Sequence, residues 1–197
     1  MLPNIRKYAI IATTRYAFGN AFFRSGKAVI EFPNGTVYDG EFSDGVFSGN
    51  GKMTYENGSV YDGQWANGKR NGKGTMCDSH CRFYTGHWKD QYPHGQGRET
   101  RPDGTIYDGQ WENGKASGQG TVTHPDGKTY IGQWKNGRPH GQGTMASADG
   151  SSYDGQIRNN LRHGRSTYTL ADGTVQTGLF ENDVFLGEAA PGGHPKS

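Results

Sequence analysis

The chain of 197 residues has few of the residues from which a thick hydrophobic core is built. Hydrophobic residues make up only 31% of it, tyrosine included, and the mean hydropathy is −0.89. This share is well below that of an ordinary globular domain, which excludes a thick packed core. Low hydropathy and 33 glycines would by themselves favour disorder, but aromatic residues reach 12%. We therefore expect an ordered structure that depends on these rings.

Three further shortages exclude other classes of protein. Two cysteines are too few for a disulfide framework, and they fit a reducing compartment. The formal net charge is only +2, so no overall electrostatic field favours nucleic acid. The longest apolar stretch, near "YAIIA" at residues 8–12, is far shorter than the roughly 20 residues of a membrane span. We predict a soluble, intracellular protein that does not bind nucleic acid.

The chain does contain an internal repeat with a constant period of 23 residues. In each full copy a tyrosine is followed two positions later by glycine and four positions later by a large apolar residue, usually tryptophan. The tyrosines of this column are Tyr38, Tyr61, Tyr84, Tyr107, Tyr130 and Tyr153. A second column carries Gly-x-Gly steps, and no insertion breaks the register.

The period defines the expected domain organisation. The repeat array spans 26–187, with a half copy at 26–37, six full copies at 38–175 and a partial copy at 176–187. Residues 1–25 are predicted to be an N-terminal cap or a targeting-like segment, and residues 188–197 a disordered tail.

Each repeat is predicted to be one β-hairpin. Tyrosine, glycine and tryptophan at i, i+2 and i+4 alternate as in a strand with one buried face. In the copy at 107–129, the strand "YDGQW" is followed by an expected polar loop "ENGKAS", a second strand "GQGTVTH" and a turn "PDG". Because glycine weakens a strand unless a ring or backbone approaches closely, we expect Gly109, Gly118 and Gly120 to make room for Tyr107 and Trp111. The fold class is all-β, an elongated, single-layer, twisted antiparallel sheet of tandem hairpins stabilised by contacts between repeats.

The motif Y-x-G-x-W-x-x-G-x-x-x-G-x-G, complete at residues 61–74 and 107–120, resembles the MORN repeat (membrane occupation and recognition nexus). The resemblance covers about 26–187. It implies a non-enzymatic β-hairpin array that serves as a scaffold or adaptor in cytoskeletal, ciliary or membrane-junction settings, in some members with phospholipid association. Copies depart from the motif at Gln91, Asn160, Asp183, Ser166, Gln176 and Ala189, which gather toward the C-terminal end as expected for a cap.

The leading functional hypothesis is that a grooved aromatic sheet binds an extended or helical segment of a protein partner. The candidate contact residues are Tyr61, Trp65, Trp88, Tyr107, Trp111, Tyr130 and Trp134. Side-chain exposure discriminates this hypothesis, since fully buried tryptophans would be core residues and not contacts.

The alternative is a peripheral membrane protein that binds phosphoinositides through a basic loop edge. Its candidate headgroup residues are Lys69, Arg70, Lys73, Lys135, Arg138, Arg162 and Arg165. Clusters of this size suffice to bind anionic lipid. A solvated, structural rim explains the same residues.

Other candidate sites repeat once per copy and are interpreted as structural. The Gly-x-Gly steps lead into no helix that would make them a phosphate site, and the turn aspartates behave as turn residues. His94, His140 and His163 share a column too widely spaced to chelate a metal. "CDSHC" brings Cys77, His80 and Cys81 to one turn, either as metal ligands between subunits or as sequence variation. We assign no catalytic residue, metal or cofactor.

The sequence leaves three further questions open. Residues 1–30 contain basic residues and no acidic one, which fits either organellar import or a segment that covers the first sheet edge. A homodimer through one sheet end would hide an open edge. The predicted location is cytoplasmic or cytoskeletal, with membrane association as the alternative.

Overall fold

The computed structural model describes residues 10–11 and 25–188, which fall into two compact units, one ending at Pro102 and the other beginning at Asp103. Every regular element in these residues is a β-strand. Among them no helix is long and apolar enough to cross a membrane. Most of the segment 1–25 and nearly all of the tail 188–197 lie outside the described residues, so both assignments stay predictions.

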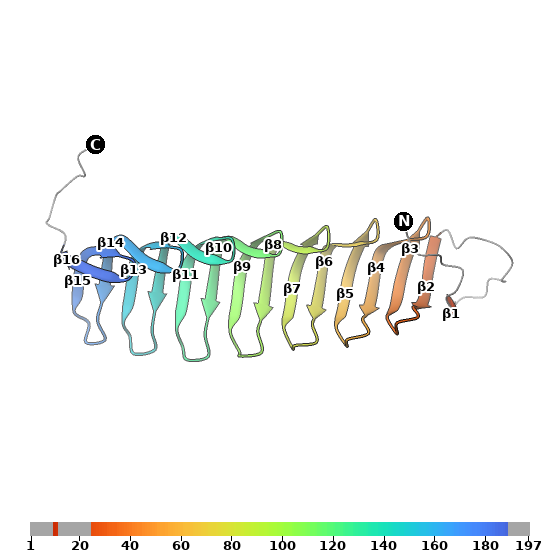
Figure 1. Cartoon of the computed structure of the whole chain (residues 1–197), viewed down its shortest axis with the longest axis horizontal. Helices are drawn as coiled ribbons and strands as arrows, with labels where there is room; N and C mark the ends of the chain where they lie inside the picture. The colour runs from red at the N-terminus through yellow and green to blue at the C-terminus, as the bar shows by residue number, and fades with distance from the viewer. Residues whose placement is uncertain (1–9, 12–24, 189–197) are drawn as a thin grey trace, which may run out of the picture. The chain divides into compact units, whose positions relative to one another are not determined.

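Unit 1 is an antiparallel sheet whose neighbouring strands follow one another in the chain (Figure 1). Its strands are β1 (Ile10–Ile11), β2 (Ser25–Glu31), β3 (Val37–Ser43), β4 (Val46–Thr54), β5 (Val60–Ala66), β6 (Lys69–Cys77), β7 (Phe83–Lys89) and β8 (Tyr92–Thr100). The short β1 pairs with β2, with Ile10 opposite Ile30.

Unit 2 repeats the same arrangement. Its strands are β9 (Ile106–Glu112), β10 (Lys115–Thr123), β11 (Thr129–Lys135), β12 (Arg138–Ala146), β13 (Ser152–Arg158), β14 (Leu161–Thr169), β15 (Val175–Glu181) and β16 (Val184–Glu188). The prediction of an all-β, single-layer antiparallel sheet built from tandem hairpins is confirmed.

The loop predicted within each repeat is shorter than expected. Only Asn113 and Gly114 connect β9 to β10, and both have positive φ (49° and 77°). Two such residues in succession form a type I′ turn, whose twist matches that of the flanking strands. The expected loop "ENGKAS" is therefore wrong, because Glu112 ends one strand and Lys115–Ser117 already belong to the next.

Where the loop glycine is absent, another residue takes the left-handed conformation. These residues are Gln91 (φ 82°), Asn160 (φ 73°) and Asp183 (φ 69°). Asparagine and aspartate tolerate this region better than most residues, whereas glutamine at position 91 is strained. The departures from the motif at these positions therefore preserve the turn.

Backbone hydrogen bonds join the loop of one repeat to the preceding repeat. Gln91 donates its N–H to the carbonyl of Arg70 (3.1 Å), Gly137 to that of Ala116 (2.8 Å), and Asp183 to that of Arg162 (3.1 Å). These bonds come in addition to the sheet ladder. Within each unit, neighbouring hairpins are thus held together at the loop end as well as along their strands.

In five of the six full copies the tyrosine lies over two facing glycines on neighbouring strands. In the last full copy Ser166 faces Gly155 beside Tyr153. Gly109 and Gly120 are directly opposite each other in β9 and β10, and a Cβ atom at either one would overlap the Tyr107 ring or its hydroxyl. The predicted role of these two glycines is confirmed. Gly118 has a different role: it adopts φ +67° at a bulge, and a Cβ there would meet the side chain of Gln110.

We expect Gly120→Ala to destabilise the protein by about 3 kcal/mol, because the new methyl group overlaps the buried Tyr107 hydroxyl. Gly150→Ala is the control: no atom lies within 4 Å of its Cβ position, and only the cost of a positive φ, about 1 kcal/mol, applies. Urea unfolding at equilibrium measures both. Equal losses of stability in the two variants would show that the ring contact does not determine the glycine.

Candidate functional site

The tyrosine hydroxyls of the repeat are used inside the sheet. Tyr61, Tyr107 and Tyr130 each donate a hydrogen bond to the backbone carbonyl three residues later, at 2.8, 2.8 and 2.7 Å. Tyr38, Tyr84 and Tyr153 do the same in their repeats. A buried hydroxyl needs such a partner. The column therefore combines a large apolar ring with a satisfied polar end.

The tryptophans link successive repeats. The indole Nε1 of Trp65 donates to the carbonyl of Gly51 (2.8 Å), and Trp88 and Trp134 make the same bond to Gly74 and Gly120 (3.1 Å each). The ring of Trp111 meets Tyr107 edge-to-face, with centroids 5.1 Å apart. Edge-to-face pairs of this kind continue within each unit.

Burial changes the role assigned to these rings. All seven candidate contact residues are at most 9% exposed: Tyr61, Trp65, Trp88, Tyr107, Trp111, Tyr130 and Trp134. By the exposure criterion stated above, they are core side chains and are removed as contacts. The neighbouring rings and the paired second strand cover them, which makes a core out of a single layer.

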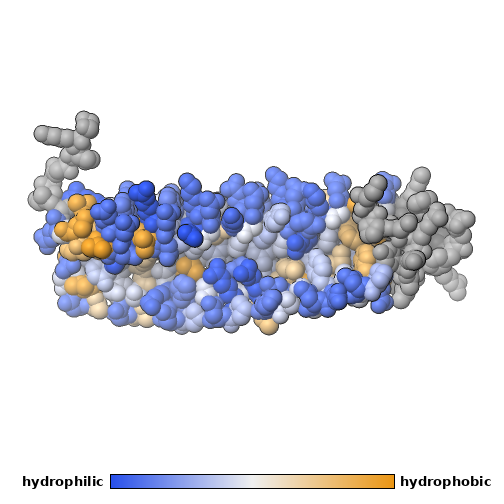
Figure 2. Space-filling model, in the orientation of Figure 1, coloured by the Kyte–Doolittle hydropathy of each residue, from blue (hydrophilic) through white to orange (hydrophobic). Residues whose placement is uncertain are grey.

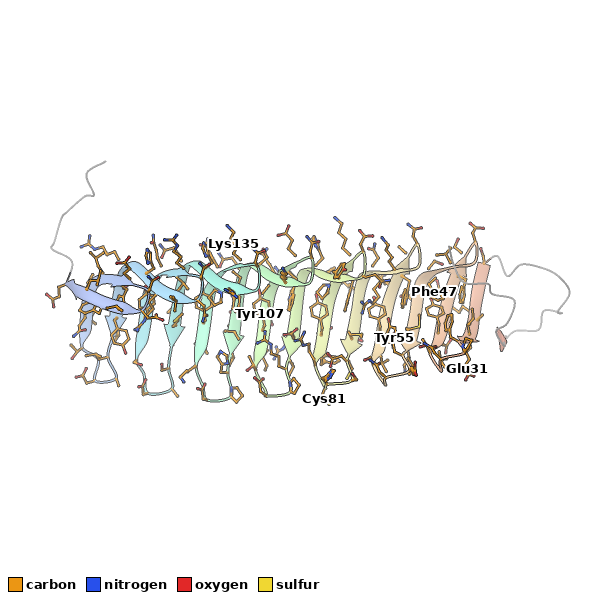
Figure 3. The ribbon with its side chains drawn as sticks, viewed as in Figure 1. Glu31, Phe47, Tyr55, Cys81, Tyr107 and Lys135 are labelled. Carbon is orange, nitrogen blue, oxygen red and sulfur yellow. The ribbon has the colours of Figure 1, made fainter. Side chains whose placement is uncertain are left out.

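A second set of side chains lies on this ring layer and stays half-buried. In unit 1 it includes Phe32, Phe47, Tyr55, Met76 and Pro93, all with intermediate exposure. Phe47 stacks on Tyr38 with centroids 4.1 Å apart, and Phe32 meets Phe47 edge-to-face at 6.4 Å. Figure 3 shows Phe47 toward the loop end and Tyr55 toward the turn end of the hairpins. Figure 2 shows a less polar band between two hydrophilic rims here. We call this band of unit 1 the unit 1 groove.

These residues are not apparent from the repeat pattern, because their columns vary in chemistry. The column of Phe47 continues as Arg70 and Pro93, and the column of Phe32 as Tyr55, Asp78 and Arg101. A variable column that faces the same side as an invariant ring column is the signal that could have found them.

Arg70 places a charged side chain in the column of Phe47. Its guanidinium lies 4.5 Å from the Trp88 ring centroid and 5.7 Å from that of Tyr61, and its Nε donates to Gln91 Oε1 at 2.9 Å. Arg162 repeats the arrangement in unit 2, 4.7 Å from the Phe180 centroid and 3.1 Å from Asp183 Oδ1. Stacking on a ring with a hydrogen-bonded edge is a packing role.

Toward β8 the unit 1 groove becomes charged. Glu99 is only 5% exposed and occupies the column of Met53 and Met76. Its carboxylate lies 2.8 Å from Arg101 Nε and 3.6 Å from an Arg82 nitrogen. A buried carboxylate needs such partners. The unit 1 groove therefore changes from aromatic at β2–β5 to a carboxylate with two half-exposed arginines.

The basic residues predicted to bind lipid do not share one surface. Arg70 and Arg162 face the ring layer, and Lys69 pairs with Asp90 at 3.0 Å. Lys73 and Arg165 lie in the Gly-x-Gly columns, while Lys135 and Arg138 flank a loop. Figure 3 shows Lys135 projecting from the loop end. Lipid binding by this set stays a prediction, and the three engaged side chains weaken it.

The face opposite the rings carries a column that is glutamine in most repeats, and its role is not apparent from the sequence. Gln64, Gln110 and Gln133 each accept, through Oε1, the backbone N–H of the residue after the bulge glycine, at 2.7, 2.8 and 2.9 Å. His87 takes this position in its repeat and lies against the Gln96 carbonyl. These side chains stabilise the bulge, so their polar ends serve the fold.

The turn "CDSHC" is open to solvent. Cys77 and Cys81 are free and exposed, and Cys81 adopts φ +61° where other turns have glycine. Among the described residues no three or more His, Cys, Asp or Glu side chains form a group that could hold a metal. Figure 3 places Cys81 at the turn edge. Metal binding by Cys77, His80 and Cys81 stays an untested hypothesis.

In unit 2, two histidines of the shared column meet at one pocket. His140 and His163 line it together with Gln133, Gln142, Gln156 and Ile157, and its volume is about 330 Å³. Ile157 stands where most repeats have tryptophan.

A family model for the MORN repeat matches residues 38–60, 61–82, 84–106, 107–129, 130–152 and 153–175. The chain belongs to the MORN repeat family. The match covers more than half of the sequence and agrees with the hairpin boundaries of the structure. No curated protein sequence matches the chain.

Two solved structures are similar to this MORN array at low identity. One is the SAS-4 (dCPAP) TCP domain of Drosophila melanogaster in complex with a proline-rich motif of Ana2 (dSTIL), at 18% identity and a TM-score of 0.48, over 83% of this chain and 96% of that chain. The other is the TCP10 domain of Danio rerio CPAP in complex with a STIL peptide, at 19% identity and a TM-score of 0.36, over 80% and 66%. At this level of likeness neither complex informs the function of the MORN array.

The buried tyrosines predict a loss of stability in alkali. Burial raises the pKa of Tyr38, Tyr61, Tyr84 and Tyr107 well above the ordinary value, and raises that of Tyr130 to about 12. The unfolded tyrosines lose their protons near pH 10, before the folded ones do. Stability is therefore complete below about pH 10 and falls as the pH rises toward 12. The urea midpoint measures the stability at each pH, and the absorbance of tyrosinate measures the ionisation of the tyrosines. A urea midpoint that stays constant up to about pH 11 would contradict the predicted loss of stability.

Proposed function

We propose that this MORN array is a non-enzymatic scaffold or adaptor that binds a segment of another protein, extended or helical, in its groove. The observation that carries the proposal is the partly exposed aromatic set Phe32, Phe47 and Tyr55, which lies on a layer of buried rings. Rigid aromatic side chains provide contact area with little loss of conformational entropy, as anchors of interfaces do.

The unit 1 groove also indicates the chemistry of the segment. Its floor is aromatic at β2–β5, and at β6–β8 it carries Arg82 and Arg101 beside the buried carboxylate of Glu99 and the partly exposed carboxylate of Asp78. Both arginines keep about half of their side-chain surface in solvent. A complementary segment therefore has apolar side chains at one end and an acidic residue at the other.

A scaffold role also fits the family. Members of the MORN family serve mostly as adaptors in cytoskeletal, ciliary and membrane-junction assemblies. On that resemblance we place this protein in the cytoplasm or at the cytoskeleton. The phosphoinositide alternative has no comparable support, because its cations are divided among different faces of the sheet. We therefore place the partner among proteins.

The repeat itself supplies variants that test the groove without unfolding it. Phe47→Arg introduces the residue that Arg70 and Arg162 provide in the same column, and Tyr55→Ser introduces that of Ser147. The matched control is Phe83→Thr, a 42% exposed residue in a column where Thr129 occurs. Phe83 alternates with the inward Tyr84, so the control changes the opposite face.

Partners of the wild type are captured by proximity labelling, and the purified partner is then titrated calorimetrically against each variant. We expect the F47R/Y55S variant to lose at least about tenfold in affinity, or ~1.4 kcal/mol. The control should bind as the wild type does. An F47R/Y55S variant with wild-type circular dichroism and wild-type affinity would place the binding surface elsewhere.

A further inference from the structure

A polar pocket lies in unit 2 beside the glutamine column of the face opposite the rings. Its volume is about 330 Å³, and residues of the four strands β11–β14 line it. The ladder places Gln142 opposite Gln156 and Gln156 opposite His163, so these three side chains form one row across β12, β13 and β14. Gln133 extends the row to β11, because its Oε1 accepts the N–H of Gln142 at 2.9 Å.

The side chains that line this pocket are rich in hydrogen-bond donors and include no carboxylate. Arg158 contributes a guanidinium, which is always charged and donates in pairs to the oxygens of an anion. His140 and His163 each add at least one imidazole N–H. Since Gln133 uses its Oε1 for the backbone, the amide N–H groups are what this side chain can offer a ligand. A lining of this composition selects an anion.

The fold alone does not explain the histidine of β14. Serine stands in the same column at Ser48 and Ser117, in repeats that form the same bulge. The Nδ1 atom of His163 is enclosed and has no hydrogen-bond partner among the described residues, so this nitrogen adds no bond to the sheet. Leaving such an atom unpaired costs free energy that serine would avoid. The imidazole is therefore better explained by a ligand than by packing.

The spacing of the two histidines excludes a metal and suits an anion. Strand β13 separates the strands of His140 and His163, which therefore lie about 10 Å apart. The ligand atoms of a metal lie only about 2 Å from it. An anion with several oxygen atoms can instead accept hydrogen bonds of about 2.8 Å from both sides of the pocket.

The distribution of charge in unit 2 favours one anionic group over an anionic surface. Residues 103–188 contain seven lysines and arginines against ten aspartates and glutamates. The basic residues Lys135 and Arg165 lie on the face of the pocket by strand alternation, and Figure 3 shows Lys135 projecting from the loop end. A membrane on this face would also meet Asp154 and the aspartates of the turns, which an anionic lipid repels. A single anionic side chain reaches the pocket without meeting them.

We propose that this pocket binds the phosphate group of a phosphorylated serine or threonine in a partner protein. The phosphate presents three strong acceptor oxygens to Arg158, to the two histidines and to the glutamine amides, whereas a carboxylate presents only two oxygens. The site belongs to unit 2 and to the face opposite the rings, so it does not rest on binding in the unit 1 groove. A failure of one does not bear on the other.

The repeat supplies variants that remove the donors and retain the fold. Arg158→Ala introduces the residue that Ala66 provides in the same column, and His163→Ser introduces the serine of its own column. The matched control, H124S/K128S, also removes one histidine and one cation from unit 2, but at the turn edge, and introduces the serines of the next copy. Circular dichroism checks the fold of each variant. If R158A/H163S is unfolded, R158A alone is used, because Arg158 is exposed.

Each protein is titrated into fluorescein-labelled nonapeptides that carry phosphoserine at the centre and mixed residues elsewhere, and binding is followed by fluorescence anisotropy. Matching libraries carry serine or glutamate at the centre. Inorganic phosphate and phosphatidylcholine vesicles that contain a phosphoinositide are the two remaining probes. We expect the wild type to bind the phosphoserine library alone, R158A/H163S to bind it at least about tenfold more weakly, and H124S/K128S to bind as the wild type does.

Several outcomes would overturn the proposal. They are a wild type that does not bind the phosphoserine library, and a folded R158A/H163S variant that binds it with wild-type affinity. Equal binding of the glutamate library would make the pocket a site for carboxylates. Binding of the vesicles in place of the peptides would make it a membrane site, and binding of inorganic phosphate as tightly as the peptides would make it a site for free phosphate.

Discussion

The close approach of a tyrosine ring to two facing glycines, made in five of the six full copies, is the contact on which the structure depends. The ring of Tyr107 occupies the space above Gly109 and Gly120 that a side chain would otherwise fill, and its hydroxyl reaches the backbone of Gln110. Because the two glycines carry no side chain, one large ring can lie flat on the backbone. The neighbouring tryptophan then packs edge-to-face against it and bonds to the previous repeat. The order of each repeat thus comes from backbone and rings, with little help from aliphatic residues.

A core made in this way has consequences for where binding can occur. The rings are covered within the layer, and the side chains of the second strand remain at its surface. Because the ring columns are fixed, the surface columns are free to vary from Phe47 to Arg70 to Pro93 without altering the fold. One repeated scaffold therefore presents a different chemistry at each step along the unit 1 groove. Specificity lies in the variable columns, and stability lies in the constant ones.

The sequence predicted the hairpins, the constant period of the repeat and the Tyr107–Gly109–Gly120 contact because each depends on strict spacing. The loop of each repeat was predicted to be too long. A two-residue turn such as Asn113–Gly114 depends on the twist of both flanking strands, which the spacing of residues does not give. The tyrosine and tryptophan rings that were predicted to contact a partner are buried. Burial in a single layer depends on what a neighbouring strand places over a ring, and spacing does not report that. The stacking of Arg70 on Trp88 was invisible for the same reason.

The hydrogen bonds that tie each loop to the preceding repeat also determine how a unit responds to force. Neighbouring strands are consecutive in the chain, so tension applied to the two ends of a unit acts across the ladder and separates one hairpin at a time. Each hairpin that peels away releases a repeat of 23 residues, roughly 80 Å of extended chain. The loop bond, such as that from Asp183 to Arg162, is broken with the strand it secures. A unit would therefore lengthen under tension in equal steps, as an extensible tether and not as a rigid strut.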